Sequence, residues 1–214
     1  SSSVIGYDEN SSYTGLGWFQ DLFDAIINKT VLHIQYKTFS DVVYDWTVHP
    51  YYIKEYNNRW FLFGLNEEKG CIYNLALDRI ESLEQVNKEY VLSDINFEHY
   101  FNDVIGATVP TEKKIPIRLK FSEHRFPYVL TKALHQSQRI VDLDNRVIEI
   151  SIIPNNELEA VILSFGKDVE VLSPPEYRTR IQGIIRESLE NYNPVQIDCT
   201  GSTYLCDINH EDHV

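Results

Sequence analysis

The chain has 214 residues and a formal net charge of −13 at pH 7, with 43% apolar and 13% aromatic residues. This apolar content is typical of folded proteins and excludes an intrinsically disordered chain, while no apolar run approaches the ~18 residues of a membrane-spanning helix. Because nonspecific binding to duplex DNA depends on neutralising phosphates, the acidic balance also argues against a general DNA-binding surface.

The cysteine content and the N-terminus indicate where the protein works. Its three cysteines, Cys71, Cys199 and Cys206, are too few and too odd in number for a disulfide framework, which favours a reducing, cytoplasmic setting. The first ten residues have neither a basic start nor an apolar stretch, so no signal peptide is expected. The sequence lacks methionine and begins at Ser1, and we expect a further N-terminal region to precede it in the full protein.

The first region after a short extension (residues 1–15) is predicted to be one helix followed by short strands. Apolar residues recur with helical spacing over 19–27. From residue 32 the period changes to two, and strands are expected over 32–37, 42–49, 51–56, 60–65 and 71–78, the last continuing over 80–83. Asn57-Asn58 predicts a tight turn, because Asn tolerates positive φ. One helix and about five strands within residues 16–85 favour a small β-barrel of the Sm-like or SH3-like kind.

Residues 86–112 lose periodicity and are interpreted as a connector, with a short anchoring helix around Phe97, Tyr100 and Phe101. Residues 113–192 then predict the order strand, helix, strand, strand, helix, strand, with a final helix after Pro174-Pro175. This βαββαβ order is typical of a ferredoxin-like domain. Residues 193–214 show no period and contain no Lys or Arg, and they are interpreted as a flexible tail. The predicted fold class is therefore α+β.

Catalytic and metal-binding signatures are absent. The sequence has no glycine-rich phosphate loop, no nucleophile elbow, no H-E-x-x-H motif and no paired-cysteine zinc spacing, so neither an enzyme nor a cofactor is expected. The tail does contain zinc-competent residue types, but their spacing is not that of a zinc finger, and no metal site is expected. These residues are Cys199, Cys206, His210 and His213.

Polar and aromatic residues at the strand ends of the first region are the candidates for binding. His49 precedes Pro50 and is either a solvated turn residue or the rim of a pocket that donates to a phosphate or base. Arg79 either forms an ion pair that fixes the strand end or presents its guanidinium to an anionic ligand. Tyrosines such as Tyr51 pack by default, yet an aromatic ring near an arginine can stack on a nucleobase.

The run from residue 49 to residue 80 resembles a WYL domain. The family is named for a Trp-Tyr-Leu strand, which reads Trp60-Phe61-Leu62 here, so the tyrosine hydroxyl is lost. His49-Pro50-Tyr51-Tyr52 precedes this strand and Leu77-Asp78-Arg79-Ile80 follows it, as in the family. The family usually has an arginine in the strand before the D-R-I segment, where this chain has Asn74.

The second region is similar to the WCX extension that often follows WYL domains, most clearly over residues 163–172, LSFGKDVEVL, and Pro174. The two resemblances cover residues 18 to about 190. They imply an Sm-like barrel joined to a ferredoxin-like domain, as in bacterial transcription regulators whose winged helix-turn-helix precedes these domains.

The resemblance implies an effector-sensing region that forms a homodimer, with operator DNA read by an N-terminal helix-turn-helix that is absent from this chain. The expected effector is a small nucleotide or a single-stranded nucleic acid, and no membrane is involved. The expected ligand-binding residues are His49, Tyr51, Arg59, Asn74 and Arg79. The alternative is a stand-alone Sm-like RNA-binding module, which requires a local basic groove although residues 16–85 contain 6 basic and 10 acidic residues.

Overall fold

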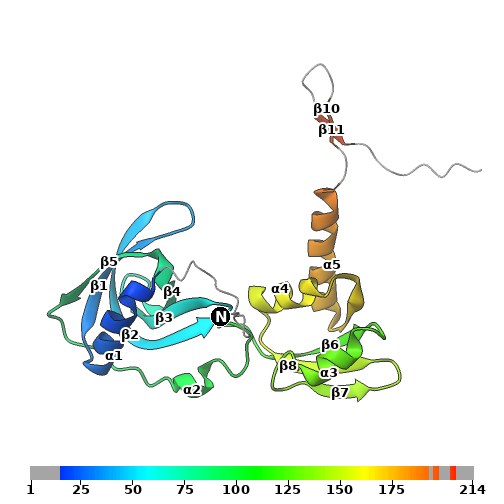
Figure 1. Cartoon of the computed structure of the whole chain (residues 1–214), viewed down its shortest axis with the longest axis horizontal. Helices are drawn as coiled ribbons and strands as arrows, with labels where there is room; N and C mark the ends of the chain where they lie inside the picture. Colours follow the sequence, from blue (N-terminus) through cyan, green and yellow to red (C-terminus); the bar gives the residue numbers. More distant parts are fainter. Residues whose placement is uncertain (1–14, 193–194, 198–202, 206–214) are drawn as a thin grey trace, which may run out of the picture. The chain divides into compact units, whose positions relative to one another are not determined.

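The computed structural model describes residues 15–192, 195–197 and 203–205, and these residues form an α+β structure with two larger antiparallel sheets (Figure 1). The chain divides into two compact units, one made of Ser1–Lys114 with Ile153–Val161 and the other of Ile115–Ile152 with Ile162–Val214. No helix in the described part of the chain is long and apolar enough to cross a membrane.

The first unit is built around a five-stranded sheet with the order β4-β3-β2-β1-β5, in which all neighbours are antiparallel. The predicted helix is present, but the strands expected over 42–49 and 51–56 are one continuous strand, and a short helix at residues 77–79 divides β4 from β5. Strands β4 and β5 lie at the two edges of this sheet, and the strand pairing does not itself close a barrel. Its elements are η1 (Leu16–Trp18), α1 (Phe19–Ile27), β1 (Val31–Lys37), β2 (Val43–Tyr56), β3 (Arg59–Asn66), β4 (Cys71–Ala76), η2 (Leu77–Arg79), β5 (Ile80–Val86) and α2 (Phe97–Tyr100).

The core of this unit lies between α1 and the sheet. Leu22 and Ala25 of α1 are buried together with Ile34, Leu62 and other strand residues. Full burial of a leucine such as Leu62 contributes about 1.5–3 kcal/mol. Trp60 is only partly buried against this core, and its ring meets that of Phe19 edge-on, with the centroids 5.0 Å apart.

The hairpin between β2 and β3 turns where the sequence predicts. Asn57 and Asn58 both adopt positive φ, 51° and 60°, as a tight two-residue turn requires. Further along this pair the register shifts between Pro50 and Tyr52, which marks a β-bulge. Gly64 lies opposite Pro50, where a Cβ atom would stand 2.5 Å from the His49 carbonyl oxygen, so only glycine fits there.

The connector covers the face of β3 that points away from the α1 core. The Phe63 ring meets the Phe101 ring at 4.8 Å, and Tyr52 of β2 stacks on Phe97 with 5.3 Å between centroids. The predicted anchoring helix is confirmed as α2, whose first turn is capped by the side chain of Asn96. Both faces of the strand that contains Trp60-Phe61-Leu62 are therefore covered by the chain itself.

The second region contains a four-stranded sheet with the order β7-β8-β6-β9, again antiparallel throughout. Its helices and strands follow the predicted sequence of elements. They are β6 (Ile115–Phe121), α3 (Phe126–Thr131), β7 (Arg139–Asp142), β8 (Val147–Ile152), α4 (Asn156–Ser164), η3 (Gly166–Asp168), β9 (Val169–Ser173) and α5 (Pro175–Glu190).

The ends of α4 are set by an asparagine and a glycine. Asn155 accepts a hydrogen bond from the Leu158 N–H at 2.8 Å and so caps the start of the helix. Gly166 follows its end with a φ of 54°, a conformation that strains other residues. Ile162 of α4 is buried together with the central strands β6 and β8.

Within the segment interpreted as a flexible tail, the structure describes two short strands. These are β10 (Val195–Ile197) and β11 (Thr203–Leu205), which pair antiparallel. The four zinc-competent residues of the tail lie outside the described residues.

Candidate functional site

A cavity of about 290 Å³ lies where the turn between β1 and β2 meets the start of β3 and the short helix η2. Asp41 supports this turn with a positive φ of 59°, and the Thr38 hydroxyl donates to the Val42 carbonyl. Three basic and three acidic residues are among those that line the cavity. The lining residues are Lys37, Thr38, Phe39, Asp41, Arg59, Asp78, Arg79 and Glu81.

Arg59 is held in place by a two-point ion pair with Asp78. Its Nε donates to Oδ1 of Asp78 at 2.8 Å and its Nη2 donates to Oδ2 at 2.6 Å. The hydrogen bonds that Arg59 donates to Asp78 raise the pKa of Arg59, although partial burial works in the opposite direction. Such a bidentate pair orients the guanidinium and uses part of its donor capacity.

Arg79 is arranged differently. Its guanidinium carbon lies 3.3 Å from the centroid of the Phe39 ring, which also has Arg59 at 5.4 Å. The Phe39 side chain is 81% exposed, although water disfavours an apolar ring. Among the described residues, Arg79 makes no ion pair with a carboxylate, so its donors can face a ligand.

The remaining charges keep the cavity close to neutral. Lys37 pairs with Asp41 at 3.0 Å, and both side chains are well exposed to solvent, so this pair contributes little to stability. Tyr36 lies in the core below, where its hydroxyl accepts a hydrogen bond from the Ala76 N–H and burial raises its pKa. The arrangement offers one guanidinium with free donors beside an exposed aromatic face, which suits a planar or anionic ligand. We call it the Arg59–Arg79 cavity.

Arg59 and Arg79 are the two predicted site residues that the structure brings together, while His49 lies elsewhere. His49 is fully buried, and its Nδ1 accepts a hydrogen bond from the Val91 N–H at 3.0 Å. The other nitrogen, Nε2, therefore carries the proton and donates to Glu67 at 2.9 Å. Glu67 in turn pairs with Lys88, so both ring nitrogens of His49 are used to hold the connector.

Tyr51 and Asn74 also hold the connector. The Tyr51 hydroxyl donates to the Val91 carbonyl at 2.9 Å, and the Asn74 amide donates to the Ala107 carbonyl at 3.1 Å. Tyr90 strengthens this contact, because its hydroxyl donates to the Pro50 carbonyl at 2.5 Å and burial raises its pKa to about 12. These interactions of His49, Tyr51 and Asn74 with the connector are called the connector contact below.

Sequence reasoning missed Phe39 and Lys37 as cavity residues. Phe39 follows Thr38 and precedes Ser40-Asp41, so it sits in a turn, where an apolar ring has no core to enter. An aromatic residue within a turn is therefore the sequence feature that could have indicated Phe39 as a cavity residue. Of the two alternatives for Arg79, the ion pair at the strand end is not found with the neighbouring Asp78, which binds Arg59 instead.

In comparisons with known proteins, the family model of the WYL domain matches residues 17–85 and that of the WCX domain matches residues 113–189. A search of curated proteins gave no match. Among solved structures, the chain is similar to proteasome accessory factor B/C (PafBC) of Arthrobacter aurescens, with 18% identity, a TM-score of 0.35, and coverage of 90% of this chain and 29% of that one.

The chain is also similar to a CRISPR Cas-related protein, with 17% identity, a TM-score of 0.53, and coverage of 84% of this chain and 53% of that one. The chain thus spans about half or less of the length of these two proteins. At this identity the second likeness supports the fold alone. The two family matches together cover more than half of the chain, which is therefore a WYL-domain protein with a WCX domain after its WYL domain.

Proposed function

We propose that this chain is the effector-sensing and dimer-forming region of a WYL-domain transcriptional regulator. A helix-turn-helix elsewhere in the full protein would read operator DNA, and the region described here would report the presence of an effector to it. The acidic balance of the chain supports this division, because an acidic surface is poorly suited to bind duplex phosphates.

The proposed architecture is an Sm-like barrel followed by a ferredoxin-like domain. The long, bulged strand β2 pairs with both β1 and β3, and a bulge increases the bend and twist that a barrel needs. In the WCX domain the order β7-β8-β6-β9, with α3 after β6 and α4 after β8, supports a ferredoxin-like topology.

The observation that carries the proposed effector class is the position of Arg79 over the exposed ring of Phe39. A phosphate or other anion can accept from the guanidinium, while a nucleobase can stack on the free face of the ring. Arg59, fixed by Asp78, places a second guanidinium at the same cavity. The effector is therefore a small nucleotide or a short single-stranded nucleic acid, bound at the Arg59–Arg79 cavity.

Fluorescence anisotropy with labelled single-stranded oligonucleotides, and calorimetry with cyclic nucleotides, test this proposal. Arg79→Ala should weaken binding by about tenfold to a hundredfold, because it removes charge-assisted hydrogen bonds contributing about 1.5–3 kcal/mol. Arg186→Ala is the matched control, since Arg186 is an exposed arginine of α5 that does not line the cavity.

Absence of binding to the wild-type chain, or equal affinity of Arg79→Ala and wild type, would show that the site is wrong. RNA binding that falls steeply with salt and responds equally to both arginine variants would instead favour a stand-alone RNA-binding module. Sedimentation equilibrium tests the proposed homodimer, and a monomer at all concentrations would contradict that part of the proposal.

A further inference from the structure

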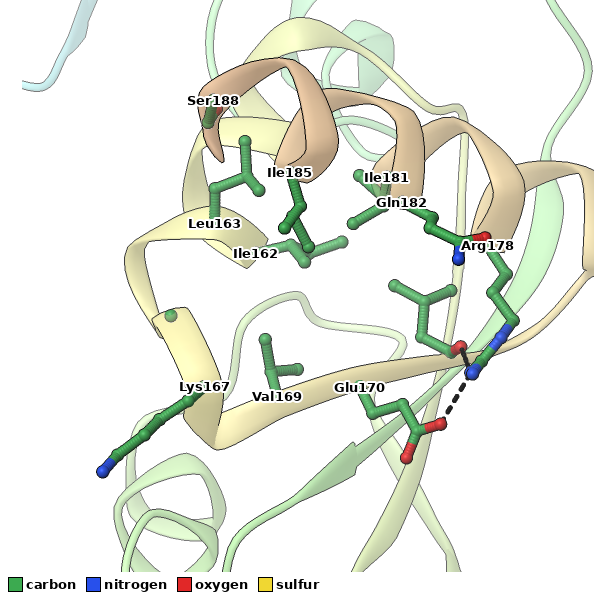
Figure 2. A pocket seen from close by; sticks show the side chains of 12 residues that line it. Ile162, Leu163, Lys167, Val169, Glu170, Arg178, Ile181, Gln182, Ile185 and Ser188 are labelled. Atoms are coloured by element: carbon green, nitrogen blue, oxygen red, sulfur yellow. Dashed lines mark hydrogen bonds and ion pairs between the residues drawn. The ribbon is translucent and has the colours of Figure 1, made fainter. Parts of the chain in front are cut away.

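The WCX domain has an apolar groove of about 660 Å³ between α4, β9 and α5 (Figure 2). Its lining includes aliphatic side chains of all three elements, and Figure 2 shows Leu163, Ile162, Ile185 and Val169 directed toward the hollow. A groove of this size could accommodate several side chains or a small ligand. No part of the proposed effector mechanism uses it.

Charged residues stand at two ends of this groove. Arg178 closes one end, where its Nη1 donates to Glu170 at 2.7 Å and to the Val171 carbonyl at 2.5 Å. Lys167 stands at the other end and points away from the hollow (Figure 2). Among the described residues Lys167 makes no ion pair, so the rim of the groove is available to acidic groups.

The last turns of α5 leave further apolar surface uncovered beside the groove. Ile185 is 53% exposed and Leu189 is 63% exposed, although Ile181, earlier on the same helix, is buried. These residues are spaced four apart and therefore form one stripe along α5. The stripe extends from the groove toward the end of the helix, which is where the C-terminal segment begins.

The C-terminal segment contains a two-stranded antiparallel ribbon that is short. Strands β10 and β11 have three residues each, and they pair Val195 with Leu205 and Ile197 with Thr203. A two-stranded ribbon of this length is marginal in water by itself, and burial of an apolar face is the usual way to stabilise it. The sequence of the ribbon, VQI and TYL, supplies apolar residues for that purpose.

We propose that the segment 193–214 folds back along α5 and packs its ribbon over the apolar groove of the same chain. Only residues 191–194 separate α5 from β10, so the ribbon begins within about 18 Å of the helix end. The helix rises about 14 Å from Ile181 to Glu190, so the ribbon can reach the whole stripe.

Charge also favours this occupant. The segment contains Asp198, Asp207, Glu211 and Asp212 and no Lys or Arg. At the rim of the groove Arg178 is paired with Glu170, which leaves the positive charge of Lys167 for an acidic partner. Opposite charges brought together in this way favour the docked arrangement, more strongly at low salt. Because the connection is short, the effective concentration of the segment at the groove is higher than that of a second copy or a free ligand.

Disulfide trapping in the full chain tests the proposal. In a background with Cys71→Ser and Cys206→Ser, Cys199 is the remaining native thiol. We compare Gln182→Cys, which lines the groove, with the matched control Glu187→Cys, which is exposed on another face of α5. The control is closer to Cys199 along the chain, so chain proximity alone would favour the control.

In a glutathione redox buffer at low protein concentration, docking should make the intramolecular disulfide form roughly tenfold faster in Gln182→Cys than in Glu187→Cys. Equal rates, or a faster control, would overturn the proposal. Disulfides that join two chains specifically at Gln182→Cys would also overturn it, because the groove would then be covered by a second copy.

Hydrogen exchange gives an independent readout on the full chain. The double variant Val195→Asp, Ile197→Asp should speed amide exchange in the last turns of α5 about tenfold, since it removes the apolar cover. Gln196→Asp is the matched control with the same charge change in the same strand, and it should leave exchange near the wild-type rate. If the double variant and the control exchange equally, the segment does not cover the groove.

Discussion

The Arg59–Arg79 cavity and the connector contact both contain polar residues predicted to bind an effector, yet the WYL domain uses them in different ways. At the connector contact, His49 bonds to the Val91 N–H and to the Glu67 side chain, and Asn74 donates to the Ala107 carbonyl. At the cavity, Arg79 forms no ion pair with another described residue, and its guanidinium lies over a ring that is largely exposed to solvent. Polarity at a strand end alone therefore does not distinguish a residue that holds the fold from one that is available to a ligand.

The largest effect that separates the two regions is expected for His49→Ala. The substitution removes a fully buried side chain, leaves the Val91 N–H without its acceptor and opens a cavity, which should lower the free energy of unfolding by about 2–4 kcal/mol. Urea unfolding measures this loss. Arg79→Ala should change the same free energy by only about 0.5 kcal/mol, because Arg79 is partly buried and forms no ion pair with another described residue.

In an effector-binding assay the order of the two effects should be reversed, with Arg79→Ala weakening binding and His49→Ala leaving it unchanged. Folded His49→Ala should bind an effector as the wild type does, because His49 does not line the cavity. If His49→Ala unfolds as the wild type does but loses binding, the assignment of the two regions is reversed.

Phe39→Ala should have the next largest effect, on binding rather than on stability. Removal of the ring takes away a stacking surface that typically contributes about 1–3 kcal/mol per base, so affinity for a single-stranded oligonucleotide should fall about fivefold to a hundredfold. Phe39→Trp is the matched control and should retain binding. The result is measured by anisotropy titration, and unchanged affinity of Phe39→Ala would show that the ring does not contact the ligand.

Much of the fold could be predicted because it depends on local patterns. The alternation around Ile34 and Leu62 and the paired Asn57-Asn58 turn indicated β1 to β4, and the spacing of Phe19 to Ile27 indicated α1. These patterns involve residues close together in the sequence. Apolar residues repeat with a period of two in a strand and 3.6 in a helix, according to which face is buried. The position of α2 in the connector followed from the same kind of spacing.

The site was harder to predict because it depends on contacts far apart in the sequence. The strand pattern placed His49 on a polar face, but Tyr90 and Val91 cover that face from 40 residues away. Arg59 and Arg79 were expected at the site, yet the residue that joins them, Phe39, comes from a turn that carries no periodic signal. Local periodicity cannot report which turn meets which strand end.

Asp78→Asn should have a smaller effect, and its direction tests whether the cavity binds anions. The substitution removes one negative charge from the wall, and a unit charge a few ångströms from a ligand is worth about 1 kcal/mol in water. Affinity for an anionic nucleotide should therefore rise about fivefold, with a larger rise at low salt. Glu84→Gln is the control, since Glu84 lies on β5 outside the cavity. Weaker binding in Asp78→Asn would show that the orientation of Arg59 matters more than the charge.

The smallest expected effect concerns the pH dependence of the connector contact. Hydrogen bonds from Lys88 and then His49 hold the pKa of Glu67 below its ordinary value in the folded protein. Because the pKa is lower when folded than when unfolded, Glu67 contributes stability above its unfolded pKa of about 4.3, and this stability is lost as the pH falls through the folded pKa. Solvent screens part of the interaction, so the contribution is below about 1 kcal/mol.

Glu67→Gln should thus lower the free energy of unfolding near neutral pH and flatten its fall below pH 4.3, as measured by urea unfolding at several pH values. Parallel curves for the variant and the wild type would mean that the Glu67 carboxylate does not hold the connector.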